Sequence, residues 1–224
     1  DRVSGGGGGN IDLRLPRDVF AYKPNVVTIM LGMNDGRYRS YDAGVYENFT
    51  TGYESMVKKI KAALPGVRIT AIRPSPYDEV TREAMKPLGY NPVLVQFGNW
   101  IQEYAKREGL AVADLNSGVV SMLDRARAAD PPQAERIIPD RVHPGPAGHL
   151  IMAGELLKSW NAPSRVSSVT LDAVSATVKD SQRAKVTGLS ATGGLSWTQT
   201  DEVLPMPVDW EDPVVKLAVN SSDF

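Results

Sequence analysis

Apolar residues follow two different periods along the first 160 positions of the chain. Residues 25–31, 67–72 and 110–115 are short, nearly continuous apolar runs rich in β-branched side chains. Runs that are apolar on both faces are typical of buried strands in parallel sheets. We therefore expect three strands, the first of them central and parallel.

Between and after these runs, apolar residues recur every three or four positions, which predicts amphipathic helices. The helices are expected over residues 45–64, 93–107, 117–129 and 147–160. Strands and helices thus alternate, and this order predicts an α/β fold. The expected architecture is a doubly wound parallel sheet with flanking helices, arranged in three layers as in flavodoxin.

The pattern changes after Asn161-Ala162-Pro163, where Val, Thr and Ser alternate with a period of about two. This alternation predicts a β-rich C-terminal addition, followed by an irregular stretch around Pro205, Pro207 and Pro213. We divide the chain into an α/β domain over residues 1–162 and a β-rich extension over 163–224. The extension carries no catalytic motif.

Composition narrows the classes of function. With 25 basic and 26 acidic residues the net charge is −1, which gives no bulk attraction to nucleic acid. No apolar run approaches the roughly 20 residues of a membrane-spanning helix. The absence of cysteine excludes disulfides, thiolate zinc sites and a cysteine nucleophile. Nothing in the sequence predicts an oligomeric state.

One of the only two histidines lies in the sequence Asp140-Arg141-Val142-His143-Pro144. At this spacing a carboxylate can accept the imidazole Nδ1–H and leave Nε2 free, which is the base half of a hydrolytic triad. A simple surface hydrogen bond is the alternative. A metal site is not predicted, because two histidines six residues apart form a poor ligand set. His149 falls inside the last helix and is interpreted as structural or exposed.

Two further segments carry candidate chemistry. Gly32-Met33-Asn34-Asp35-Gly36 follows the first strand, where the Asn34 amide would be a good donor to a developing oxyanion, although Asn-Asp-Gly also favours an ordinary turn. Ser4-Gly5 leads into a glycine run that is usually a flexible loop. Its useful feature is the backbone N–H of Gly5 as a second oxyanion donor. Carboxyl ends of parallel strands meet at one edge of the sheet, so these elements are expected to gather there.

In this order, Ser4-Gly5, Gly32-x-Asn34-Asp35 and Asp140-x-x-His143-Pro144 resemble the second, third and fifth sequence blocks of the SGNH (GDSL-type) hydrolase superfamily. The resemblance covers about residues 1–160 and is greatest to bacterial secreted members described as GDSL-like lipases or acylhydrolases. It implies that His143 is the general base, Asp140 its orienting carboxylate, and Asn34 and Gly5 the oxyanion-hole donors.

The chain departs from the family pattern at its nucleophile. The family's serine lies in a Gly-Asp-Ser block upstream of the Ser-Gly block, and this chain has no Gly-Asp-Ser. We therefore expect no nucleophile in this chain, and we interpret residues 1–224 as an internal fragment of a serine esterase. The fragment by itself is expected to be inactive by that mechanism.

The resemblance implies a small-molecule or carbohydrate ester as substrate: a lipid, a short acyl ester or an acetylated sugar. It implies no metal or organic cofactor, and a secreted or periplasmic location. Tyr77 and Tyr90 fall on predicted loops, where they are candidates to contact the acyl or alcohol group. Ordinary loop tyrosines are the alternative interpretation.

Two other hypotheses remain open from the sequence. A non-catalytic binding or structural relative would have kept the fold and lost the nucleophile, although it would have no chemical need for Asn34, Asp140 and His143 together. A nucleotide-binding protein would rest on the glycine run alone, and no Lys or Asp stands at phosphate- or ribose-binding spacing.

Overall fold

A computed structural model describes residues 9–84 and 89–223 of the protein. The chain forms two compact units. The first contains residues up to Trp160 together with those from Asp209 onward, and the second contains Asn161–Val208.

The first unit is built on a parallel three-stranded sheet. Its strands are β1 (Val26–Met30), β2 (Arg68–Arg73) and β3 (Ala111–Asp114), in the order β1-β2-β3. Val27 pairs with Ile69, and Ala71 pairs with Val112, so the three carboxyl ends lie at one edge. The predicted parallel α/β sheet is confirmed.

The prediction that the first strand is central was wrong for the described sheet, where β2 is central and β1 forms an edge. Val26 and Met30 on β1 are 39 % and 46 % exposed, whereas β2 is buried over most of its length. A continuous apolar run records the preference of side chains for burial, and it does not specify whether both backbone edges of the strand are paired.

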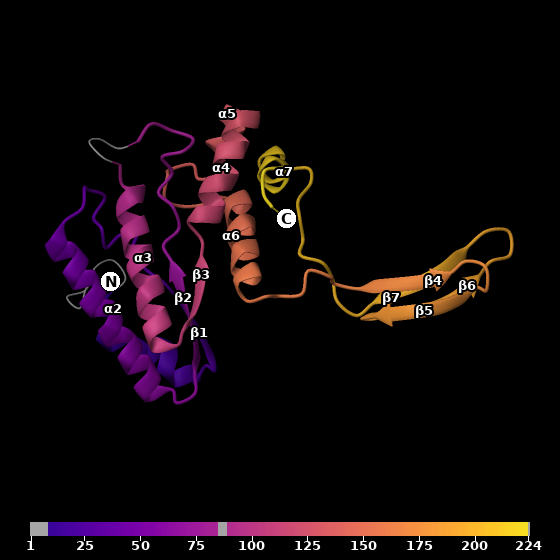
Figure 1. Ribbon diagram of the computed structural model, residues 1–224, viewed down its shortest axis with the longest axis horizontal. Helices are drawn as coiled ribbons and strands as arrows, with labels where there is room; N and C mark the ends of the chain where they lie inside the picture. Colours follow the sequence, from indigo (N-terminus) through magenta and orange to yellow (C-terminus); the bar gives the residue numbers. More distant parts are fainter. Residues whose placement is uncertain (1–8, 85–88, 224) are drawn as a thin grey trace. The chain divides into compact units, whose positions relative to one another are not determined.

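Four long helices flank the sheet as the apolar spacing predicted. Figure 1 shows α2 (Ala43–Ala63) and α3 (Asn91–Glu108) on one side, and α4 (Ser117–Ala129) and α6 (Pro146–Ser159) on the other. Shorter helical segments also belong to the unit: α1 (Ile11–Arg14), η1 (Leu15–Val19), η2 (Phe20–Tyr22) and α5 (Pro131–Ala134).

Aromatic side chains join α2 to α3. Phe49 and Phe97 stack with their ring centroids 4.3 Å apart, and Tyr53 meets Trp100 edge-on at 5.7 Å. The Asp42 carboxylate accepts the N–H of Val45 and caps the start of α2. These contacts fix the layer that lies beneath the carboxyl end of β1.

The second unit consists of two antiparallel hairpins. One pairs β4 (Ser168–Asp172) with β5 (Thr177–Gln182), and the other pairs β6 (Ala184–Ser190) with β7 (Ser196–Asp201). The predicted β-rich addition is confirmed for this segment. Within the described part of the chain, no helix combines the length and apolar composition needed to cross a bilayer.

The stretch after Pro205, predicted to be irregular, ends in a helix, α7 (Pro213–Asn220). The Asp212 carboxylate caps this helix by accepting the N–H of Val214. Val214, Val215 and Ala218 are buried, and α7 packs against α6, α4 and α5. Residues 209–224 therefore group with the first unit, and not with the extension in which the sequence interpretation had placed them.

Candidate active site

Asp140 and His143 form the hydrogen bond that their spacing predicts. The Nδ1 atom of His143 lies 2.6 Å from Oδ2 of Asp140, while Oδ1 accepts the backbone N–H of His143 at 2.7 Å and that of Val142 at 3.0 Å. Because the carboxylate occupies Nδ1, the imidazole is left with Nε2 as its free nitrogen. The His143 side chain is 80 % exposed, so Nε2 is accessible to a substrate.

The same bonds favour the ionised form of Asp140. The pKa of the Asp140 carboxyl lies well below its usual range, first because the backbone N–H of His143 donates to it, and then because the imidazole and the N–H of Val142 also donate. An ionised carboxylate is the form that accepts Nδ1–H and stabilises an imidazolium.

The loop that carries the pair is held by two arginines from different segments. Arg82 donates to the carbonyl oxygens of Glu135, Ile138 and Pro139 at 2.8–3.0 Å. Arg141, with a positive φ of 72°, donates through its guanidinium to the carbonyl of Glu83 at 2.7 Å. These bonds attach residues 135–141 to the segment after β2.

A buried carboxylate supports the same attachment. Asp78 is fully buried, and it accepts the N–H groups of Val80 and Thr81 at 3.0 and 2.9 Å. Its own backbone N–H donates to the carbonyl of Arg141 at 2.9 Å, and its Oδ2 lies 3.5 Å from Arg82. The site loop is thus bonded to a segment that is itself internally fixed.

Asn34 lies on a tight turn directly after β1. Gly32 has a φ of +130°, and a Cβ there would lie 2.7 Å from Cγ of Pro74, so the turn requires glycine. The carboxylate of Asp35 accepts the N–H of Gly32 at 3.0 Å. The Asn34 side chain is exposed, and its Oδ1 accepts a hydrogen bond from the Tyr38 hydroxyl at 2.6 Å.

Asn34 and His143 line one groove of about 500 Å³ at the carboxyl edge of the sheet. Apolar side chains form much of its wall, together with Ser75 after β2 and His149 on α6. His149 is exposed, as one of its two sequence interpretations held. The groove walls include Met30, Leu31, Met33, Leu115, Val142, Met152 and Leu156.

Two other predicted site residues, Tyr77 and Tyr90, do not line this groove. Tyr90 is fully buried and Tyr77 is 9 % exposed, so the interpretation of these tyrosines as substrate contacts is not supported. Their rings pack beneath the Asn34 turn, where they support it. Gly5 and Ser4 lie outside the described residues.

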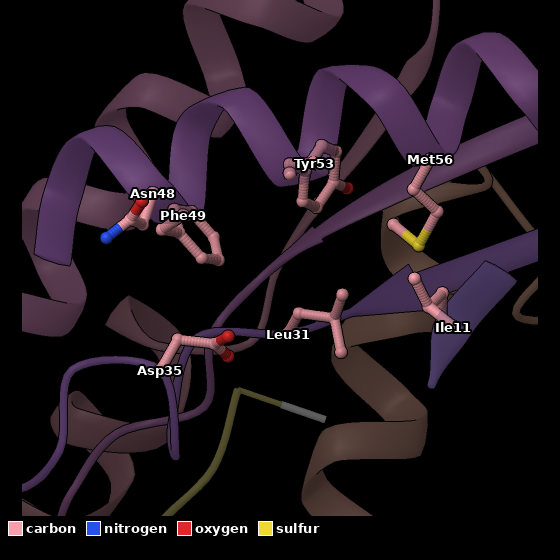
Figure 2. A pocket seen from close by; sticks show the side chains of 8 residues that line it. Ile11, Leu31, Asp35, Asn48, Phe49, Tyr53 and Met56 are labelled. Carbon is pink, nitrogen blue, oxygen red and sulfur yellow. The ribbon is translucent and has the colours of Figure 1, made fainter. Parts of the chain in front are cut away.

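A second cavity, of about 40 Å³, lies between α2 and the end of β1. Figure 2 shows Phe49, Tyr53 and Met56 of α2 on one side of it, and Leu31 and Asp35 on the other. Burial raises the pKa of the Tyr53 hydroxyl. The space is on the scale of a single water molecule, roughly 30 Å³ in the liquid, and is too small for an ester substrate.

Comparison with known proteins places this geometry in a family. The model of the GDSL-like Lipase/Acylhydrolase family matches residues 2–151. The chain belongs to this family. The family match confirms the resemblance that the three sequence blocks indicated, and it covers the Asn34 turn and the Asp140–His143 loop.

Acylhydrolases of known structure resemble the chain over much of its length. An acetylxylan esterase from Geobacillus stearothermophilus is 26 % identical over 163 residues, which cover 70 % of this chain and 68 % of the esterase. The crystal structure of Axe2, an acetylxylan esterase from the same organism, is 26 % identical with a TM-score of 0.52, over 69 % of each chain. Two other Axe2 structures are of catalytic mutants, in which a serine or an aspartate is replaced by alanine.

Another match covers a larger share of the chain. A gut microbial diltiazem-metabolizing enzyme is 27 % identical with a TM-score of 0.73, covering 88 % of this chain. The match covers 47 % of that enzyme, so this chain spans about half of its length.

Sequence reasoning missed two residues of the site, Tyr38 and Arg82. Tyr38 reaches Asn34 only because Arg37 and Tyr38 both adopt positive φ, and neither of these two residues is a glycine that would mark this conformation in the sequence. Arg82 acts on carbonyls more than 50 positions away. Neither contact has a local sequence signal.

Proposed function

We propose that the protein is a carboxylic ester hydrolase in which His143 is the general base, oriented by Asp140, and Asn34 donates to the oxyanion. One observation carries this proposal: His143, whose Nδ1 is held by Asp140, lines the same groove as Asn34. A base and an oxyanion donor at a common groove are the parts that acyl transfer requires.

The chemistry proceeds in two steps in this proposal. A serine hydroxyl attacks the ester carbonyl while His143 Nε2 takes its proton, and the oxygen that becomes negative accepts from Asn34 and from the backbone N–H of Gly5. His143 then returns the proton to the leaving alcohol. Water attacks the acyl group in the same way, releasing the acid and regenerating the serine.

The attacking serine, in this proposal, lies outside residues 1–224. No Gly-Asp-Ser occurs in the sequence, and Asp180-Ser181 belongs to a hairpin of the second unit. The alternatives within the chain are Ser4, which lies outside the described residues, and Ser75, which lines the groove but is only 7 % exposed. Removing the nucleophile from a triad costs about 10⁶-fold in kcat, so its location decides whether this chain acts alone.

The proposed substrate is a short acyl ester, with acetylated xylo-oligosaccharides as the first to test. This choice follows from the similarity to acetylxylan esterases. The full-length gene product should hydrolyse p-nitrophenyl acetate and release acetate from the acetylated oligosaccharide.

The test compares variants of the full-length protein. We expect His143→Ala to lower kcat/KM by about 10⁴-fold or more. Asp140→Asn should lower it by about 10³- to 10⁴-fold, because an amide can hold the wrong tautomer. Asp124→Asn, at an exposed position on α4, should leave kcat/KM unchanged. Wild-type activity that survives His143→Ala would refute the proposal.

A fluorophosphonate probe locates the nucleophile independently. The probe should label a serine outside residues 1–224, identified by mass spectrometry of the full-length protein. Labelling of Ser4 or Ser75 would overturn that location while preserving the esterase function. An intact full-length protein with no reactive serine and no turnover would instead favour the non-catalytic relative.

A further inference from the structure

Tyr38 is the residue that fixes the side-chain amide of Asn34. Its hydroxyl donates to Oδ1 at 2.6 Å. The oxygen and nitrogen of an asparagine amide have nearly the same shape, so a hydrogen bond is what decides which way the group points. With Oδ1 occupied, the two N–H groups of Nδ2 are left to a ligand, since residues 9–84 and 89–223 supply no acceptor for them.

An unusual backbone conformation makes this contact. Arg37 and Tyr38 have φ values of 58° and 52°, so two consecutive non-glycine residues occupy the left-handed region. Such conformations are costly, persist only where surrounding contacts enforce them, and cluster at functional sites. The N–H of Arg37 donates to the carbonyl of Asn34 at 3.2 Å, which closes the turn.

Two buried tyrosines supply the enforcing contacts. The ring of Tyr38 lies 5.1 Å from that of Tyr90 and 6.0 Å from that of Tyr77, measured between centroids. The Tyr90 hydroxyl donates to the carbonyl of Met33, immediately before Asn34. A side chain at Gly36 would collide with this hydroxyl. Tyr90 thus holds the backbone just before Asn34, and Tyr77 and Tyr90 together hold the Tyr38 ring that follows Asn34 in the chain.

We propose that Tyr38 is a positioning residue, which presents Nδ2 of Asn34 to the groove by engaging Oδ1. The catalytic consequence rests on the proposed esterase function, whereas the positioning itself does not. Without the Tyr38 hydroxyl, the amide would also populate the opposite orientation. In that orientation Oδ1 faces the developing oxyanion and repels it.

A single-atom change tests the proposal in the full-length protein. Tyr38→Phe keeps the ring packing and removes only the donor. We expect kcat to fall about tenfold with KM little changed, since a complete loss of one oxyanion donor costs about 10²- to 10³-fold. Tyr41→Phe, which removes a hydroxyl from an exposed tyrosine nearby, should leave both constants unchanged.

A double-variant cycle separates positioning from a general structural role. In an Asn34→Ala background, Tyr38→Phe should cause no further loss of kcat, because the group that it positions is gone. An equal loss in both backgrounds would overturn the proposal, since a hydroxyl that merely stabilises the fold acts regardless of residue 34.

Nuclear magnetic resonance tests whether Tyr38 positions the Asn34 amide, and it does so without a measurement of enzymatic activity. In ¹⁵N-labelled protein, the side-chain amide signals of Asn34, assigned by their loss in Asn34→Ala, should move in Tyr38→Phe and not in Tyr41→Phe. Unchanged signals in Tyr38→Phe would overturn the positioning itself. A protein without esterase activity whose Asn34 signals move would instead refute the proposed function and leave the positioning established.

Discussion

At the scale of single residues, the Asp140 carboxylate serves two partners at once. One oxygen accepts backbone N–H groups and closes the loop, and the other accepts the imidazole of His143. Both contacts are strongest with the ionised form, because protonation places a hydrogen on one of the two acceptor oxygens. The chemistry and the local fold therefore depend on the same charge.

Acid should weaken this arrangement in a defined range. The pKa of Asp140 is lowered in the folded protein, so its stabilising contribution is fully present above the unfolded value of about 3.9. The contribution is lost as pH falls from there toward the folded pKa. We expect the unfolding free energy of wild type to fall more steeply than that of Asp140→Asn between pH 4 and 3.

Urea unfolding of both proteins at pH 6, 4 and 3 provides the measurement. Asp180→Asn, at an exposed carboxyl in the second unit, serves as the matched control and should follow wild type. Parallel curves for wild type and Asp140→Asn would contradict the expectation.

Sequence alone identified Asp140 and His143 because their contact is local. Three residues of spacing, a positive-φ turn and a following proline suffice to bring the carboxylate to the ring. The Asn34 amide was found for a similar reason, as it follows a recognisable strand. For Tyr77 and Tyr90 the sequence left substrate contacts and ordinary loop tyrosines as alternatives, because a loop position in sequence does not reveal that the side chain turns inward.

At the scale of elements, the loop over residues 135–143 depends on contacts from outside itself. It contains no long helix or strand of its own, and Arg82 binds three of its carbonyl groups. Arg82 also lies 3.5 Å from the buried carboxylate of Asp78. One side chain thus links the order of the site loop to that of the segment after β2.

Removing this link should loosen the loop. We expect Arg82→Ala to cost about 2–4 kcal/mol of unfolding free energy, because three carbonyls and a buried carboxylate lose a charged donor. Amide hydrogen exchange should rise over residues 136–143 in particular. Arg136→Ala should change little, since the Arg136 guanidinium is exposed and bonds only Gln133 within the described residues.

Uniform destabilisation in Arg82→Ala, with no local rise in exchange, would show that Arg82 supports the fold and not the loop specifically.

The order of helices and strands could be predicted from the sequence, because the period of apolar residues differs between the two kinds of element. The role of Arg82 in the loop could not be predicted, because a guanidinium that binds carbonyl groups far away in the sequence produces no periodic pattern.

At the scale of the whole molecule, the chain leaves the first unit at Trp160 and returns to it at Asp209. The returning helix α7 buries Val214, Val215 and Ala218 against the first unit. The change in composition near residue 162 predicted a second part. The return of the chain was not predicted, because an eight-residue helix that begins at a proline has too few turns to show the period of its apolar residues.

The contribution of α7 can be measured directly. We expect Val215→Ala to lower the unfolding free energy by about 2 kcal/mol, because it leaves a void at a side chain that is 4 % exposed. Lys216→Ala, on the exposed face of the same helix, should change stability by less than about 0.5 kcal/mol. Equal and small effects of both, in thermal or urea unfolding, would show that α7 adds little to the core.

The late position of α7 also sets an order of events during synthesis. When the first 160 residues have left the ribosome, the strands and helices of the first unit are present, but the apolar surface that α7 covers is still open. Two hairpins must be translated before residues 214–218 emerge, and domains generally fold as units as the chain grows. The first unit is therefore begun before the hairpins and completed after them, so a nascent chain stalled within the hairpins carries an exposed apolar patch that a chaperone can bind.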